Sequence, residues 1–176
     1  MKKNQWVSRL KVSTLAVLML GALANANQVT AETLAPETKK ITVLGTSDVH
    51  GNVWDYSYED NKEADLGFAK IGTIVKQERA NNPNLILVDA GDNLQGTLLT
   101  DDLYSSNADL QNVPHPVITA MNTIGYDAMA LGNHEFNFGT DLILKAEREA
   151  TFPLLSANTY LKGTDTNFVG STTVKN

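Results

Sequence analysis

The sequence contains no cysteine. This absence excludes disulfide bonds, and it also excludes thiolate ligands for a metal ion. A transition metal bound by this chain must therefore be held by imidazole nitrogen and by the oxygens of aspartate, glutamate or asparagine. Histidine is scarce as well, with three residues in a chain of 176, so imidazole ligands are few.

Basic residues are outnumbered by acidic ones, 14 to 20, which gives a net charge of -6. All the acidic residues lie after residue 31 and four of the basic ones lie before it, so loss of residues 1–31 would leave a charge of -10. Binding to a nucleic-acid backbone requires clustered lysine and arginine. The composition therefore argues against a nucleic-acid duplex as a partner.

Residues 1–31 have the pattern of a secretory signal peptide. Basic residues precede an uncharged apolar run, Val12–Ala24, and Val29–Ala31 fits a small-x-Ala cleavage site. The run is shorter than the ~20 residues that a membrane-spanning helix needs. We therefore expect an exported protein, with no membrane span after cleavage, in a periplasm, at a cell wall or in the medium.

Strands and helices are predicted to alternate after a polar linker at residues 32–40. Runs of apolar residues predict buried strands at Ile41–Thr46 and Leu85–Asp92, and further strands within Tyr126–His134 and Phe152–Tyr160.

Apolar residues at helical spacing predict the helices between these strands. One follows Asp65, a candidate N-cap, another ends at Gly125, and a third lies within Thr140–Ala150. The alternation of strand and helix predicts a layered α/β domain.

Polar clusters end three of the four predicted strands: Asp48-x-His50, Gly91-Asp92-Asn93 and Gly132-Asn133-His134-Glu135. In open α/β sheets, ligands bind beyond the carboxyl ends of the strands, so the three clusters are expected to converge. Their oxygen and imidazole donors suit Zn, Mn or Fe. The two glycines are expected to let the backbone turn sharply and approach a ligand.

In this order, the three clusters resemble the first three motifs of the calcineurin-like metallophosphoesterases. The segments SDVHGN, DAGDNLQGT, HPVITAMN and LGNHEFNFG are similar to those of exported 5'-nucleotidases and 2',3'-cyclic-nucleotide 2'-phosphodiesterase/3'-nucleotidases. The resemblance extends from Ile41 to about Tyr160. It implies that residues 41–176 are the N-terminal part of the catalytic domain, the first βαβαβαβ portion of an αββα sandwich.

The resemblance also implies two divalent metal ions, such as Zn or Mn. Asp48 and His50 would bind the first ion, Asp92 would bridge both, and Asn133 would bind the second. His134 would face the phosphate as the catalytic residue, stabilising the transition state or protonating the leaving oxygen. Two ions that share a carboxylate lower the pKa of a bound water and neutralise charge during an in-line displacement.

The chain departs from the 5'-nucleotidase pattern at Asn137, where an aspartate is expected to pair with the histidine. An amide oxygen can orient the ring of His134, but it cannot stabilise the imidazolium by charge. Asparagine is expected at this place in the cyclic-nucleotide branch, so Asn137 favours that branch.

A second departure is that no histidine follows His134. The resemblance implies three more histidine ligands, two of them in a Gly-His-x-His segment, and a C-terminal substrate-binding domain. Two four-coordinate ions with one shared ligand need about seven protein ligands, whereas four are offered. We therefore expect this chain to be part of a longer enzyme and to be inactive alone.

Other polar residues are expected to have supporting places. Glu135 would orient neighbouring groups or face solvent, and Asn93 and Gln95 would lie near the substrate. His115 is expected at the surface or at a helix start rather than as a metal ligand.

The sequence thus predicts an exported metal-dependent phosphoesterase that hydrolyses a nucleotide or cyclic nucleotide. A 2',3'-cyclic-nucleotide 2'-phosphodiesterase/3'-nucleotidase is the favoured activity, with a 5'-nucleotidase or UDP-sugar hydrolase as the alternative. A non-catalytic exported binding protein, or an inactive fragment that keeps the scaffold, is the alternative from another class.

Overall fold

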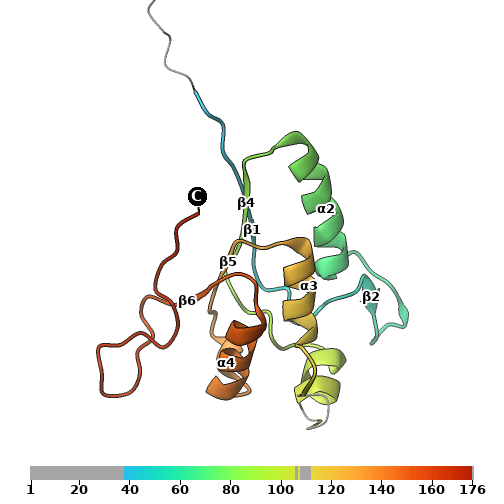
Figure 1. Ribbon diagram of the computed structural model, residues 1–176. Helices are drawn as coiled ribbons and strands as arrows, with labels where there is room; N and C mark the ends of the chain where they lie inside the picture. Colours follow the sequence, from blue (N-terminus) through green and yellow to red (C-terminus); the bar gives the residue numbers. More distant parts are fainter. Residues whose placement is uncertain (1–37, 106, 108–111, 176) are drawn as a thin grey trace, which may run out of the picture. The chain divides into compact units, whose positions relative to one another are not determined.

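The computed structural model describes residues 38–105, 107 and 112–175, and the chain from Lys40 onward forms one compact unit (Figure 1). The predicted signal peptide lies outside the described residues. Within the described part of the chain, no helix has the length and apolar character needed to cross a membrane.

A parallel four-stranded sheet forms the centre of this unit, in the order β1-β4-β5-β6. The strands are β1 Thr42–Thr46, β4 Leu85–Asp89, β5 Ala128–Ala130 and β6 Leu154–Leu155. All four predicted strands are therefore present, although the third and fourth are much shorter than their apolar runs. Because neighbours in sequence are also neighbours in the sheet, the chain crosses it stepwise in one direction.

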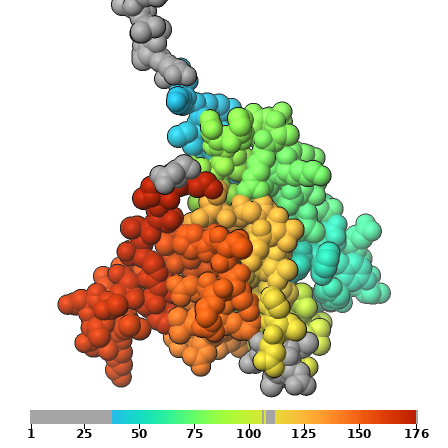
Figure 2. All heavy atoms as spheres, viewed as in Figure 1, coloured from blue at the N-terminus to red at the C-terminus, as the bar shows by residue number. Residues whose placement is uncertain are grey.

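Three helices connect these strands: α2 Gly67–Asn81, α3 Pro116–Ile124 and α4 Thr140–Glu149. Helix α2 packs on α3, and α3 packs on α4. Figure 2 shows their green, gold and orange surfaces next to one another. Apolar side chains from the helices and from β4, β5 and β6 form one core, centred on Leu87, Ile118, Met129, Ile143 and Leu154. The predicted α/β class is confirmed.

The first strand is not buried as predicted. Strand β1 lies at the edge of the sheet, and its residues alternate between half-buried and exposed, with Val43 61% exposed. In the next strand, Leu85, Leu87 and Asp89 are buried, while Ile86 and Val88 are only half-buried. An apolar run alone does not distinguish an edge strand from a central one, which is why the prediction was wrong.

The predicted helix ends were partly correct. Gly125 ends α3 in the left-handed conformation, with φ 81°, and its N–H donates to Met121 O. Asp65, however, is not the N-cap of α2. Leu66 occupies that position without a side-chain cap, while the Asp65 carboxylate lies 3.4 Å from Lys70 Nζ.

Smaller elements lie in the connecting loops. Strands β2 Tyr56–Ser57 and β3 Lys62–Glu63 form an antiparallel pair after β1. A π-helical turn, Leu98–Ser105, precedes α3, and a 3-10 turn, His134–Phe136, follows β5.

His115 caps α3 from inside the protein. Its Nδ1 accepts a hydrogen bond from Val117 N, its ring meets Tyr104 edge to face, and its side chain is fully buried. Of the two places predicted for it, the helix start is confirmed and the surface is wrong. Burial lowers the pKa of His115 from 6.5 to about 4, because the charged ring would lose its hydration.

This depressed pKa predicts a loss of stability in acid. Protonation favours the unfolded chain, so the stabilisation is complete above pH ~6.5 and declines as the pH falls towards ~4. By pH ~4.5 the loss should reach about 2.5 kcal/mol. Urea unfolding of the wild type and of His115→Asn, which keeps an acceptor for the cap, should show this loss in the wild type alone. Parallel pH dependences would contradict it.

Candidate metal centre

The loop after β1 brings Asp48 and His50 together. Both residues have left-handed backbones, with φ 55° and 49°, which is uncommon for residues other than glycine. Asp48 Oδ1 lies 3.7 Å from His50 Nε2, and both side chains are at least partly open to solvent. A carboxylate oxygen and an imidazole nitrogen at this separation can bind one divalent cation between them.

Backbone hydrogen bonds join this loop to the loop after β4. Asp48 N donates to Gly91 O at 3.0 Å, and His50 N donates to Asp92 O at 3.1 Å. The predicted convergence of the first two clusters is therefore observed, and it is fixed by the main chain.

Two glycines allow the loops after β4 and β5 to touch. A Cβ on Gly91, which has φ 98°, would lie 2.2 Å from Gly132 N. A Cβ on Gly132 would lie 2.3 Å from Asp92 Oδ1. Each glycine is thus required by the close approach of the opposite loop, and the positive φ of Gly91 agrees with the sharp turn expected there.

The Glu135 carboxylate holds these two loops together. It is 1% exposed, and four backbone N–H groups donate to it. Gly132 N and Asp92 N lie 2.7 and 2.8 Å from Oε2. Asn93 N and Leu94 N lie 2.7 and 3.2 Å from Oε1. Of the two predicted roles, orienting neighbouring groups fits this geometry, whereas facing solvent does not.

His134 lies between the other clusters. Its backbone N donates to Asp92 Oδ1 at 2.7 Å, and its ring centroid is 5.2 Å from that of His50. The amide nitrogen of Asn137 lies 3.1 Å from His134 Nδ1, in place of the amide oxygen expected from the sequence. Donation from Asn137 to Nδ1 leaves the ring proton on Nε2, from which the neutral ring can donate a hydrogen bond to a ligand.

The donors present suit divalent metals, but they do not form a closed site. Among the described residues, no three carboxylate or histidine side chains lie close enough to hold one ion. Asp92 uses Oδ1 to accept from His134 N, and Asn133 is exposed at the start of the 3-10 turn. The Asp48–His50 pair is the part of the predicted ligand set that already converges.

The two residues predicted near the substrate differ in position. Gln95 is half-buried. Asn93 is fully buried, and its side chain bonds to Val49 N and to Asp89. Because these contacts occupy both ends of the amide, the Asn93 side chain lies beneath the site, and its place near the substrate stays a prediction.

Sequence reasoning missed a polar network beneath the site. Asp89, the last residue of β4, is buried and accepts hydrogen bonds from Thr46 Oγ1, Gly91 N and Asn93 Nδ2. Thr46 also bonds to the Tyr126 hydroxyl. Burial raises the pKa of Asp89 above its ordinary value and raises that of Tyr126 to about 12. The sequence did contain a signal for this network, because Asp89 is an acidic residue within the apolar run LILVDAG.

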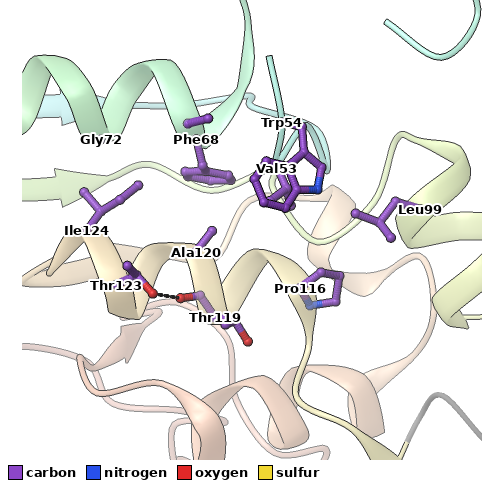
Figure 3. Close-up of a pocket in the computed structure, with 11 residues that line it drawn as sticks. Val53, Trp54, Phe68, Gly72, Leu99, Pro116, Thr119, Ala120, Thr123 and Ile124 are labelled. Atoms are coloured by element: carbon purple, nitrogen blue, oxygen red, sulfur yellow. Dashed lines mark hydrogen bonds between the residues drawn. The ribbon is translucent and has the colours of Figure 1, made fainter. Parts of the chain in front are cut away.

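A separate pocket of about 530 Å³ lies between α2 and α3 (Figure 3). Phe68, Trp54, Pro116 and Ile124 are among the apolar residues that line it, and none of the candidate metal ligands does. The hydroxyls of Thr119 and Thr123 donate to helix carbonyls, so they are not free to bind a phosphate. The candidate metal ligands lie outside this pocket, at the strand ends.

Comparisons with known proteins identify the family and the fold. A family model described as calcineurin-like phosphoesterase matches residues 41–172. The chain is 36% identical over 151 residues to the trifunctional nucleotide phosphoesterase protein YfkN of Bacillus subtilis, covering 81% of this chain and 10% of that protein. It is 35% identical over 142 residues to a 2',3'-cyclic-nucleotide 2'-phosphodiesterase/3'-nucleotidase of Yersinia enterocolitica, covering 80% and 22%. It is 40% identical over 162 residues to a 5'-nucleotidase of Vibrio vulnificus, covering 89% and 27%.

Solved structures show the same fold. The crystal structure of YfkN matches with a TM-score of 0.67 and 37% identity, over 74% of this chain and 40% of that chain. A putative 5'-nucleotidase of Staphylococcus aureus matches with a TM-score of 0.65 and 26% identity, over 74% and 25%. The chain thus spans between a tenth and about a quarter of the length of these curated relatives.

The contacts of Glu135 predict a large effect of a neutral substitute. Glu135→Gln would place an amide NH2 against two backbone N–H groups and remove a charge that four donors share, which should destabilise the fold by about 3 kcal/mol. Urea unfolding would measure this, with Glu59→Gln on the exposed surface as the control. A difference between the two variants below about 1 kcal/mol would be incompatible with the contacts described.

Proposed function

Because the chain belongs to the calcineurin-like phosphoesterase family, we propose that it supplies part of the active site of an exported metal-dependent enzyme that hydrolyses nucleotide phosphate esters. The observation that carries this proposal is the Asp48–His50 pair beside the ring of His134, on loops bonded to Asp92. This arrangement would put cation ligands and a hydrogen-bond donor within reach of one phosphate group.

The proposed roles follow from the chemistry of each side chain. Asp48, His50, Asp92 and Asn133 would hold two divalent ions, which would supply positive charge to the phosphate and acidify a water. With Nδ1 accepting from Asn137, His134 would stabilise charge on the phosphate by donating a hydrogen bond from Nε2. Protonation of the leaving oxygen would require the charged ring, with the Asn137 amide oxygen facing Nδ1 instead. Asn137 would fix the tautomer and the orientation of that ring through Nδ1.

We propose a 2',3'-cyclic nucleotide or a 3'-nucleotide as the substrate. Asn137 supports this choice, because the amide leaves His134 without the carboxylate partner expected in 5'-nucleotidases. The 40% identity to the Vibrio vulnificus protein supports a 5'-nucleotidase as the second candidate. Comparing the hydrolysis of 2',3'-cyclic AMP with that of 5'-AMP separates the two.

Export and domain boundaries are part of the same proposal. The basic residues before Val12–Ala24 and the small residues after it support cleavage near residue 31. Residues 32–40 would then be a linker, and residues 41–176 would form the N-terminal part of the phosphoesterase domain.

The division of roles predicts different losses in two histidine variants. His50→Ala should lose most bound Mn²⁺, because it removes a ligand, whereas His134→Ala should retain metal and lose the EDTA-sensitive hydrolysis of bis-p-nitrophenyl phosphate. Mass spectrometry of metal content, together with the assay, measures both. Equal metal loss in the two variants would refute the division. Absence of EDTA-sensitive hydrolysis by the intact enzyme that contains this chain would favour a non-catalytic binding protein.

The contact between Asn137 and His134 predicts a shift in the pH profile. Asn137→Asp would place a carboxylate about 3 Å from Nδ1, which can only accept where the amide NH2 donates, so the pH profile of kcat of the intact enzyme should extend to higher pH. Asn158→Asp, on an exposed loop, adds the same charge as a control. A profile that moves equally in both variants would show that the effect is not local.

A further inference from the structure

Asn93 is the point where three loops of the candidate site meet. Its side-chain Oδ1 accepts from Val49 N at 3.2 Å, and its Nδ2 donates to Asp89 Oδ1. Its backbone N donates to Glu135 Oε1, and its backbone oxygen accepts from Gly51 N at 2.9 Å. A fully buried residue thus bonds to the loop after β1, to the end of β4 and to the 3-10 turn after β5.

The side-chain amide of Asn93 satisfies both of its hydrogen-bonding partners, Val49 N and Asp89 Oδ1. Val49 N requires an acceptor, whereas Asp89 Oδ1 requires a donor, and a carboxylamide offers one of each. An aspartate here would set two carboxylates against each other in a buried place. An apolar residue would remove the acceptor of the half-buried Val49 N–H and one donor of the buried Asp89 carboxylate.

Val49 lies between the two proposed ligands of the first ion. The peptide groups on both sides of it connect residues with left-handed backbones, Asp48 and His50, which persist only where the surroundings fix them. A hydrogen bond to Val49 N fixes the plane of the Asp48–Val49 peptide. That plane determines the direction in which the Asp48 side chain leaves the main chain.

We propose that Asn93 is a positioning residue, which holds Asp48 and His50 in the conformation that binds the metal through its contact with Val49. This inference rests on the proposed function only for the identity of the ligands. Its geometric part, that Asn93 fixes the loop after β1, stands on the described contacts alone.

The test compares Asn93→Asp and the milder Asn93→Ser with a matched control elsewhere in the fold. Asn122 in α3 also uses both ends of its side-chain amide, donating to Glu149 O and accepting from Thr151 N at the end of α4. It is not part of the candidate site. Asn122→Asp therefore reports the general cost of changing a bridging amide. Circular dichroism and urea unfolding establish the conditions in which all three variants are folded.

Under those conditions, calorimetric titration with Mn²⁺ should give both Asn93 variants a dissociation constant at least tenfold higher than that of the wild type. The dissociation constant of Asn122→Asp should stay within twofold of the wild-type value. Hydrogen exchange of the Val49 amide, measured by NMR without metal, should be at least tenfold faster in the Asn93 variants alone. Wild-type Mn²⁺ affinity in either Asn93 variant, or unchanged exchange at Val49, would overturn the proposal. Absence of Mn²⁺ binding in the wild type would reject a metal centre formed by this chain alone, and exchange at Val49 would then decide whether Asn93 fixes the loop.

Discussion

The candidate site depends on one buried carboxylate. Glu135 accepts four backbone N–H groups, three from the loop after β4 and one from Gly132 after β5. These N–H groups turn away from regular secondary structure and would otherwise lack acceptors inside the protein. A charged acceptor satisfies them together, so the two loops take one shape and cannot move independently. The loop after β1, which carries Asp48 and His50, is in turn bonded to the loop after β4 that Glu135 holds.

The same arrangement explains why small and strained residues gather here. Gly91 and Gly132 contact each other's loops so closely that any side chain on either would overlap the opposite one. Asp48, His50 and Asp92 all have positive φ angles, which cost energy in residues other than glycine. Hydrogen bonds that backbone N–H groups donate to the side chains of Glu135, Asn93 and Asp89 offset that cost. Backbone strain is thus concentrated where the candidate ligands lie, a common feature of functional sites.

The buried amide of Asn93 and the buried carboxylate of Asp89 form a layer beneath the site. Asp89 collects hydrogen bonds from Thr46 and Asn93, so the ends of β1 and β4 are connected by side chains as well as by the ladder between the strands. The side chains above this layer, Asp48, His50 and His134, are partly open to solvent and can meet a ligand. A rigid base with open donors above it is the geometry that a phosphate-binding metal site requires.

The sequence alone determined the α/β class, the convergence of the three polar clusters and the family, because parallel strands with polar ends follow from local patterns of apolar and polar residues. It did not determine that β1 lies at an edge, that Glu135 is buried, or that the Asn93 side chain lies beneath the site. Those outcomes depend on which backbone N–H groups lack partners after folding and on which side chain can reach them. Such information exists only once distant segments are in contact, and tertiary structure alone decides it.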